Sequence, residues 1–212
     1  MNLGLMINME EKILNSNFFN RDTLDVARDL LGKNIVRNFS GNFFRGKIVE
    51  VEAYTGINDK ACHSYGNKKT NRNKIMYEGP GTIYVYLTYG MHYMFNIVTR
   101  DVDIPEAVLV RAIEPIDSFD IISQNRYGKN FEDLRNSEKL SLTSGPGKLT
   151  KALKIDKSLN GKRIFGPDIF IEDTNFKGEI FASKRIGIDF SEQAKDYPYR
   201  FCLQSPYLSK KL

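Results

Sequence analysis

A long uncharged run, residues 82–98, constrains the fold more than any other segment, because it contains no Asp, Glu, Lys or Arg. Such a run is stable only when it is buried, either in a membrane or in a protein core. It is shorter than the roughly 20 apolar residues that a membrane-spanning helix needs, and Gly90, His92 and Asn96 interrupt it. Its tyrosines and β-branched residues are typical of strands. We therefore predict that residues 82–98 form core strands of a soluble protein.

Several other segments also have the composition of strands. Residues 34–39 and 43–51 are rich in β-branched and aromatic side chains, and Ser40-Gly41-Asn42 between them can adopt the positive φ of a tight turn. This pattern predicts a β-hairpin. A further apolar strand is expected at residues 106–113, and shorter strands are expected at residues 168–172, 185–190 and 199–203.

One helix is predicted with both of its ends. Asn20 or Asp22 can cap its N-terminus, and Gly32 is placed to end it in a left-handed conformation. The apolar positions between them share one helical face: Leu24, Ala27, Leu30 and Leu31. Residues 118–127 and 131–142 have mixed helical patterns that we expect to cover the sheet, and another helical pattern spans residues 149–153.

Length, charge and cysteine content narrow the class of protein. The chain has 212 residues, which is enough for one sizeable core and favours one domain. Its net charge of +5 favours polyanionic partners, although charge alone agrees equally well with a basic protein that has no such partner. Cys62 and Cys202 form neither a disulfide framework nor a CxxC zinc motif, so a reducing compartment is the simplest interpretation. Residues 1–9 lack the pattern of a secretory signal.

The end of the second hairpin strand carries a candidate catalytic carboxylate. Glu50 and Glu52 lie on one face of this strand, and Val49 and Val51 lie on the other. Two glutamates on one face normally mark a solvated surface. Glu52, however, is followed by Tyr54 and a glycine turn, and side chains at strand ends can project into a cleft.

A basic loop and a series of tyrosines follow this strand. Residues 58–74 have little apolar periodicity and predict an exposed loop, whose cations are Lys60, Lys68, Lys69, Arg72 and Lys74. The tyrosines at positions 84, 86, 89 and 93 can pack in a core, which is their commoner fate, or can stack on nucleic-acid bases. Tyr89 precedes Gly90 at the end of a strand pattern, so we expect its ring on a tight surface turn, facing away from Tyr86.

Two further cations are candidates for ligand contact. Arg111 lies within an apolar strand, and a buried guanidinium requires a carboxylate or a ligand as its partner. The segment Ser144-Gly145-Pro146-Gly147-Lys148 precedes a helical pattern and offers backbone amides and a cation, as a phosphate cradle would. It is not a Walker loop, and a plain junction between a loop and a helix is an equal alternative.

An ordered series of motifs runs along the chain. It comprises Glu52-Ala53-Tyr54, His63-Ser64, Arg72-Asn73, Met76, Pro80-Gly81-Thr82-Ile83-Tyr84-Val85-Tyr86-Leu87-Thr88-Tyr89-Gly90-Met91, Asn96, Leu109-Val110-Arg111-Ala112-Ile113-Glu114-Pro115 and Ser144-Gly145-Pro146-Gly147-Lys148-Leu149. From about Leu24 to Leu203, the chain thereby resembles the alkyladenine (3-methyladenine) DNA glycosylases. The ordered series is far more specific than any one of its motifs.

The resemblance implies both a fold and an activity. The fold is α+β, a single mixed domain with a curved, mostly antiparallel, open barrel-like sheet flanked by helices; we expect it to span residues 1–212, with residues 1–16 as a flexible N-terminal segment. The activity is that of a monofunctional base excision repair enzyme without a cofactor or a metal. It flips an alkylated or deaminated purine (3-methyladenine, 7-methylguanine, hypoxanthine or ethenoadenine) out of duplex DNA and hydrolyses its N-glycosidic bond, leaving an abasic site. We expect a monomer in the cytoplasm at the nucleoid, or in the nucleus of a eukaryote.

The chemistry can also be argued from the residues. Breaking the bond between base and sugar builds positive charge on the sugar, which a nearby carboxylate can stabilise while it deprotonates a water. The resemblance assigns this water to Glu52 and Arg111. It assigns the base pocket to Tyr54, His63, Tyr86 and Asn96. DNA contact is expected at Tyr89, Met91, His92, Lys68, Lys69, Arg72 and Lys148, and Tyr84 is expected in the core.

Two rival functions remain open at this point. A non-enzymatic nucleic-acid binding module would use the tyrosines and cations but would leave Glu52 and Arg111 without a role. A metal-dependent hydrolase would need His63, His92 and a carboxylate, although the spacing of these two histidines matches no ligand motif. The basic loop also departs from the family pattern, since Asn71 replaces an expected proline and lysines replace expected arginines.

Overall fold

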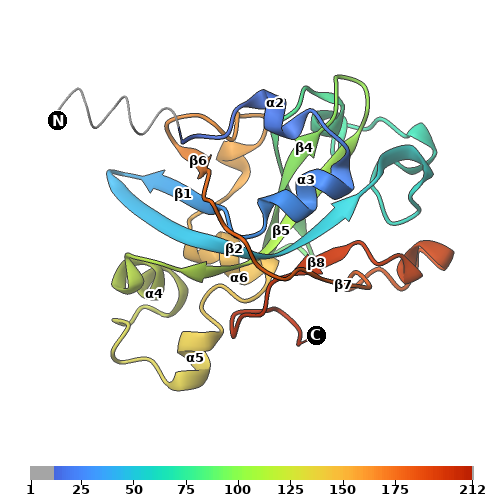
Figure 1. Cartoon of the computed structure of the whole chain (residues 1–212). Coiled ribbons are helices and arrows are strands. Elements are labelled where there is room, and N and C mark those ends of the chain that lie inside the picture. The colour runs from blue at the N-terminus through green and yellow to red at the C-terminus, as the bar shows by residue number, and fades with distance from the viewer. Residues whose placement is uncertain (1–11, 212) are drawn as a thin grey trace.

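The computed structural model describes residues 12–211, and its centre is the long strand β2 (Asn42–Tyr54). β2 crosses the molecule from left to right in Figure 1 and pairs with three other strands, all of them antiparallel. The sheet order is β3-β4-β5-β2-β1-β6, with β8 also paired to β2 and β7 paired to β8. The other strands are β1 (Asn34–Phe39), β3 (Ile83–Thr88), β4 (His92–Thr99), β5 (Glu106–Pro115), β6 (Ile169–Glu172), β7 (Phe181–Ser183) and β8 (Arg200–Cys202). The predicted single α+β domain with a curved antiparallel sheet is confirmed.

Two tight turns join neighbouring strands where the sequence predicts them. Ser40 and Gly41 connect β1 to β2 with φ values of 52° and 80°. Tyr89 and Gly90 begin the connection from β3 to β4 with φ values of 50° and 67°. Two successive residues with positive φ match the right-handed twist of the strands that they join, which explains a glycine in each turn.

Side chains alternate between the two faces of the sheet and form two apolar clusters. The larger cluster includes Val51, Val85, Phe95 and Val110 from neighbouring strands. The smaller cluster includes Tyr84, Val98 and Ala107 from the opposite face, with Cys62, Met76 and Tyr77 from the loop that follows β2. Period-two alternation thus separates a structural face from a second face, which the loop at residues 55–82 partly covers.

A pair of β-bulges sets which side chains of β2 reach this second face. The pairing runs Ile48 with Ile113, Glu50 with Ala112 and Val51 with Val110. β2 therefore has one extra residue at Val49, and β5 has one at Arg111. Ile48 and Val49 both belong to the larger cluster, and Glu50 and Glu52 consequently point to the other face.

Five α-helices are described: α2 (Ser16–Phe19), α3 (Thr23–Leu30), α4 (Phe119–Tyr127), α5 (Asn136–Leu140) and α6 (Pro146–Ala152). α3 packs on β2 and β5, and α6 packs on β4 and β5. In Figure 1, α3 lies in front of the sheet and the fading of α6 places it behind. The side chain of Asp22 accepts hydrogen bonds from Leu24 N and Asp25 N, and Gly32 follows the helix with a φ of 83°, so both predicted ends of α3 are confirmed.

Short 3-10 helices fill several connections: η1 (Gly56–Asn58), η2 (Tyr65–Asn67), η3 (Lys74–Tyr77), η4 (Lys157–Leu159) and η5 (Glu192–Asp196). The first three lie in or beside the predicted basic loop. Most of the segment 1–16, which was predicted to be flexible, lies outside the described residues. Its last residues pack on the domain, since Leu14 is buried and Ile13 forms a β-bridge with Glu172. In the described part of the chain, no helix is long and apolar enough to cross a membrane.

Three predictions of secondary structure are wrong. Residues 185–190 form turns instead of a strand, because Arg185 is buried in a salt bridge to Asp59 and the amide of Ile186 donates to Glu52 instead of to a neighbouring strand. Only Asn136–Leu140 of the predicted helical segment 131–142 is helical. α6 begins at Pro146, so part of the predicted loop belongs to the helix, where Pro suits the first turn.

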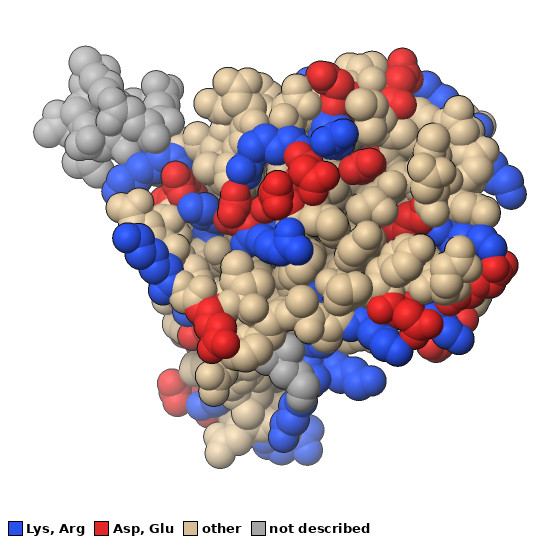
Figure 2. All heavy atoms as spheres, turned by 45° about the vertical axis from the view of Figure 1, so that its right-hand side comes forward, with Lys and Arg blue, Asp and Glu red and all other residues tan. Residues whose placement is uncertain are grey.

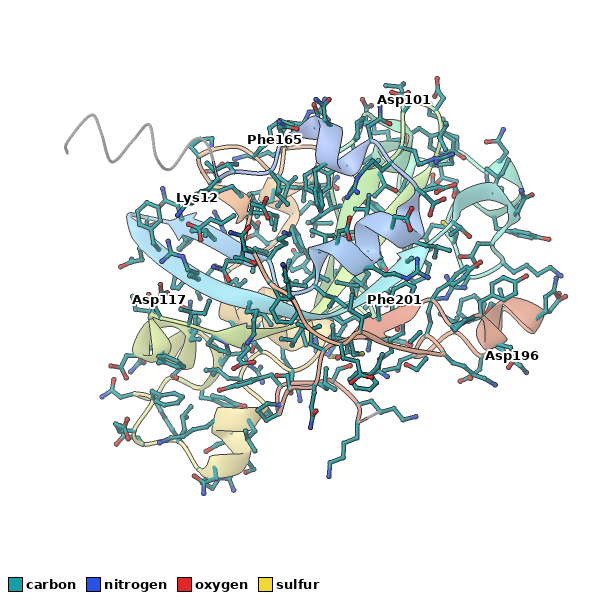
Figure 3. The ribbon with its side chains drawn as sticks, viewed as in Figure 1. Lys12, Asp101, Asp117, Phe165, Asp196 and Phe201 are labelled. Atoms are coloured by element: carbon teal, nitrogen blue, oxygen red, sulfur yellow. The ribbon has the colours of Figure 1, made fainter. Side chains whose placement is uncertain are left out.

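The surface mixes charges of both signs. On the face in Figure 2, Lys and Arg side chains lie beside Asp and Glu side chains. Exposed ion pairs contribute to such mixing, for example Lys162 with Asp168 and Lys184 with Asp196. In Figure 3, Asp117 and Asp196 mark the left and right of the molecule, and Phe201 of β8 lies between them. The candidate active site lies around the C-terminal end of β2, on the right of Figure 1.

Candidate active site

Glu52 lies at the centre of the candidate active site, completely buried near the end of β2. Its Oε1 accepts a hydrogen bond from the backbone N of Ile186 at 2.7 Å and lies 3.2 Å from Nη1 of Arg111. Its Oε2 accepts a hydrogen bond from the Tyr54 hydroxyl at 2.8 Å. A buried carboxylate with this many donors is held in one orientation, which is the state a base or a charge-stabilising group requires.

Arg111 is buried and joins two carboxylates. Its Nη1 faces Glu52, and its Nε donates to Oε1 of Glu50 at 3.0 Å. An inward Arg111 was predicted to need a carboxylate or a ligand, and the structure gives it two carboxylates. Although burial by itself lowers the pKa of Arg111, the charges of Glu52 and Glu50 outweigh burial and raise that pKa. Arg111 also lines the mouth of a recess, so it can reach a ligand there.

Tyr54 links this carboxylate to an aromatic recess. Burial, followed by the charge of Glu52, raises the pKa of the Tyr54 hydroxyl well above its usual value, so the hydroxyl stays protonated and donates. The guanidinium of Arg185 lies 4.7 Å from the ring centroid of Tyr54, and Arg185 makes a buried bidentate salt bridge with Asp59. This arrangement fixes the ring of Tyr54, which lines the recess.

His63, Tyr84 and Tyr86 also line the recess and contact one another. Nδ1 of His63 lies 2.9 Å from the hydroxyl of Tyr84, and the ring centroids of His63 and Tyr86 lie 4.6 Å apart. Desolvation, with a smaller effect of Arg72, lowers the pKa of His63 to about 4. The imidazole is therefore neutral near pH 7. The tautomer of the neutral imidazole decides whether Nδ1 accepts from the Tyr84 hydroxyl or donates to it, and Nε2 then has the opposite role.

Asn96 lies at the inner end of the recess and is almost completely buried. Its Nδ2 donates to the carbonyl oxygen of Tyr84 at 3.1 Å and to that of Met94 at 3.3 Å. The empty space at this depth is about 260 Å³, including the part open to solvent. A wider space of about 830 Å³, which also includes open solvent, adjoins it and is lined by Tyr54, His63 and Arg111 among others. The structure thus brings together all four predicted base-pocket residues and both predicted catalytic residues.

Tyr89 stands at the mouth of the recess on the turn between β3 and β4. It is 85% exposed, and Met91 beside it is 70% exposed. Tyr86 is partly buried and lines the deeper recess. The predicted surface position of Tyr89 is confirmed. Phe190, which also lines the mouth and is 75% exposed, was not predicted as a site residue.

The predicted DNA-contacting cations do not all lie in the same setting. Arg72 lines the mouth, with its guanidinium 5.1 Å from the ring centroid of Tyr86. Lys69 lies over the ring of Tyr77 at 4.7 Å, and Lys68 is exposed nearby in the chain. Lys148 is exposed on α6.

His92 is exposed and packs on α6, because a Cβ at position 147 would lie 2.9 Å from its Cγ. Gly147 is therefore required for this close approach. Among residues 12–211, no group of three or more His, Cys, Asp or Glu side chains is placed to hold a metal ion. His63 instead hydrogen-bonds to Tyr84, as described above.

Sequence reasoning missed several residues of the site. Glu50 was treated as half of a solvated pair, yet it is completely buried between Arg111 and Arg200. Tyr84 is buried as predicted, but its hydroxyl also positions His63. Ser209 also contributes, with two hydrogen bonds to Glu50. Arg111 is the residue from which the burial of Glu50 could have been predicted, because a buried cation close to two glutamates suggests that it forms ion pairs with both.

The chain is similar to known proteins over most of its length. Residues 17–206 match the model of the family described as methylpurine-DNA glycosylase (MPG). A relative from Clostridium novyi is 54% identical over 201 residues, covering 94% of this chain and 100% of the relative. One from Desulfitobacterium hafniense is 51% identical over 202 residues, covering 94% of this chain and 100% of the relative. Both relatives carry the name "Putative 3-methyladenine DNA glycosylase".

Proposed function

The chain belongs to the methylpurine-DNA glycosylase family. From this membership we propose that it removes damaged purines from duplex DNA by hydrolysing their N-glycosidic bond, with Glu52 as the catalytic carboxylate. The protein is a monofunctional DNA glycosylase for alkylated purines. The observation that carries the proposed site is the buried Glu52 carboxylate, fixed by Tyr54, Ile186 and Arg111 beside an aromatic recess. The proposed product is an abasic site.

Glu52 acts on the sugar side of the reaction. As the bond between C1′ and the base nitrogen breaks, its electron pair leaves with the base and positive charge develops on the sugar. The carboxylate stabilises that charge and accepts a proton from the attacking water, whose oxygen forms the new bond to C1′. Arg111 orients the water from the other side. No lysine is among the described residues that line the recess, which agrees with hydrolysis by water.

The aromatic recess suits an alkylated purine. Methylation at N3 of adenine or N7 of guanine gives the base a positive charge, and electron-rich ring faces attract such a cation. Tyr54, Tyr86 and His63 all line the recess, and we propose that Tyr54 stacks on one face of the base while His63 and Tyr86 contact the other face. The low pKa of His63, about 4, keeps its ring neutral, so it does not repel a cationic base. We include 3-methyladenine, 7-methylguanine, hypoxanthine and ethenoadenine among the proposed substrates.

Asn96 is proposed as the residue that excludes normal guanine. Its amide is held by two backbone carbonyl groups, so its side chain is a fixed obstacle at the inner end of the recess. Guanine differs from hypoxanthine by the exocyclic 2-amino group. A fixed side chain can exclude that group by steric contact.

The exposed turn supports action on duplex DNA. A damaged base reaches the recess only after leaving the helix, and an aromatic side chain can fill the gap that it leaves. Tyr89 has the required exposure and stands at the mouth of the recess. Met91, His92, Arg72, Lys68, Lys69 and Lys148 are proposed to contact the surrounding DNA. We propose that the enzyme acts as a monomer on cellular DNA, at the nucleoid in a bacterium.

The proposal is tested with duplexes that each carry one defined lesion. After incubation with purified protein, hot alkali converts abasic sites into strand breaks, and methylated genomic DNA serves as the substrate for measuring free 3-methyladenine. Release of methylated purines with no release from undamaged duplex is the expected result. Binding of every lesion duplex without any base release would refute the enzymatic function in favour of a binding module. Trapping of a protein–DNA adduct by borohydride would refute the monofunctional mechanism.

A further inference from the structure

A second buried carboxylate lies directly behind the proposed catalytic pair. Glu50 has no exposed surface and accepts four hydrogen bonds. Its Oε1 accepts from Nε of Arg111 at 3.0 Å, from Nε of Arg200 at 2.8 Å and from Oγ of Ser209 at 2.6 Å. Its Oε2 accepts from the backbone N of Ser209 at 2.6 Å. All four donors are thus fixed by one carboxylate that does not itself line the recess.

The C-terminal tail, residues 204–211, supplies half of these donors. The Ser209 hydroxyl also lies 3.3 Å from Nη2 of Arg111, so Ser209 contacts both partners of the Arg111–Glu50 pair. The next residue is held as well, since Arg200 donates to the carbonyl oxygen of Lys210 at 2.5 Å. In Figure 1 the tail, drawn in red, lies below β8. Segments far apart in sequence therefore meet at Glu50.

The four charges of this network are balanced. Glu50 and Glu52 are paired with Arg111 and Arg200, so two negative and two positive groups share one buried region. Burial by itself raises the pKa of Glu50, but the charge of Arg111 and the hydrogen bonds from Ser209 and Arg200 outweigh burial and lower that pKa. Glu50 therefore stays ionised at neutral pH and keeps its hold on Arg111.

We infer that Glu50 and the C-terminal tail residue Ser209 are positioning residues for Arg111, so that Ser209 connects the end of the tail to the catalytic centre. This inference rests on the proposed function. The planar guanidinium has two directions of attachment, Nε to Glu50 and Nη1 to Glu52. If the first is loosened, the second no longer fixes the plane, and the groups of Arg111 that face the recess lose their orientation. Orientation errors of about 1 Å at a reacting group are enough to slow catalysis strongly.

The variant Ser209→Ala tests the inference without removing a charge. It deletes the hydroxyl that contacts Glu50 and Arg111 and keeps the backbone N–H that donates to Glu50. Ser205→Ala is the matched control, because Ser205 is another serine of the same tail and donates to Glu114 instead. Ser209→Thr restores a hydroxyl and serves as the rescue. Glu50→Gln is the stronger perturbation, but its folding has to be checked first.

Two measurements are made on each variant. The first is the single-turnover rate of base release together with affinity for the lesion duplex. Ser209→Ala should lower the rate about tenfold with unchanged affinity, whereas Ser205→Ala should leave both unchanged. Ser209→Thr should recover most of the rate. The second is hydrogen exchange of the Arg111 Nε–H by NMR in the free protein, assigned by its loss in Arg111→Lys; exchange should be about tenfold faster in Ser209→Ala than in Ser205→Ala.

The two measurements separate the two hypotheses. Unchanged Nε–H exchange in Ser209→Ala would refute the positioning role, whatever the activity. Faster exchange with an unchanged rate of base release would also refute it, because Arg111 would then not need the tail for catalysis. If the wild-type protein releases no base, the proposed function fails, and with it the catalytic part of the inference, while the exchange result still decides whether Ser209 fixes Arg111.

Discussion

Glu52→Gln is the substitution that tests the proposed chemistry most directly. Glutamine has nearly the shape of glutamate, so its oxygen can still accept from Ile186 N and from Arg111, and its amide nitrogen can donate to the Tyr54 oxygen. The recess should keep its form. What is lost is one negative charge and the ability to accept a proton from water.

The expected loss of activity follows from that charge. Without Glu52, the balanced group of Glu50, Glu52, Arg111 and Arg200 carries one net positive charge, which opposes the positive charge on the sugar. A unit charge about 4 Å away contributes about 4 kcal/mol at an effective dielectric constant of about 20. This energy corresponds to about three orders of magnitude in rate. Loss of a general base alone gives roughly 10²–10⁴. Both terms come from one carboxylate, so we expect a loss of about two orders of magnitude or more.

The assay compares single-turnover base release with binding to the same lesion duplex. Glu52→Gln should bind the lesion duplex, release base at a rate reduced by about two orders of magnitude or more, and melt only a few degrees lower, because its hydrogen bonds are retained. Glu114→Gln is the control, since Glu114 lies on the neighbouring strand β5 in a partly exposed pair with Lys47. A rate for Glu52→Gln within tenfold of the wild type would refute the catalytic assignment.

Three other substitutions test separate parts of the site. Tyr89→Ser should weaken the flipped complex on duplex DNA in a base-flipping fluorescence assay and leave the melting temperature almost unchanged, since Tyr89 is 85% exposed; a large fall in melting temperature with unchanged flipping would show that its role is structural. Asn96→Ser should increase release of guanine from mismatched pairs, and unchanged selectivity between guanine and hypoxanthine would contradict the steric role. His63→Gln concerns pH: the folded-state pKa of His63 is about 4 and its ordinary value is 6.5, so the unfolded state binds more protons between these values and His63 contributes stability that is lost as pH falls from 6.5 towards 4. Urea unfolding at several pH values should therefore give a weaker pH dependence in this interval for His63→Gln than for the wild type, and identical slopes would contradict the neutral imidazole.

Much of the fold could be predicted because its signals are local. The cap at Asp22, the turn glycines Gly32 and Gly41 and the apolar residues of α3 each act on their own segment. The uncharged run at residues 82–98 was expected in the core, and it forms β3 and β4, although the turn between them exposes Tyr89 and Met91. Period-two alternation then correctly separated Val49 and Val51 from Glu50 and Glu52.

The rest depended on contacts between distant segments. Burial of Glu50 requires Arg200 and Ser209, which lie about 150 residues further along the chain. Residues 185–190 have the alternation of a strand, but Arg185 pairs with Asp59 and Ile186 donates to Glu52, so the site uses these groups instead of a strand ladder. Neither the burial of Glu50 nor the loss of a strand at residues 185–190 can be seen in the periodicity of the sequence, because each depends on partners that only the fold brings close.

The bulge at Val49 divides β2 into two parts with different roles. Before it, the strand belongs to the hairpin with β1; after it, the strand carries Glu50 and Glu52 into the network with Arg111. A structural change in the hairpin can therefore be absorbed at the extra residue without rotating the carboxylates. The turn at Ser40 and Gly41 then becomes a permissive place for a peptide tag or a fluorescent reporter, whereas deletion of Val51, which is paired with Val110, would turn Glu52 to the apolar face of the sheet. The same strand thus offers one position where insertions are tolerated and another where losing a single residue would be fatal to the site.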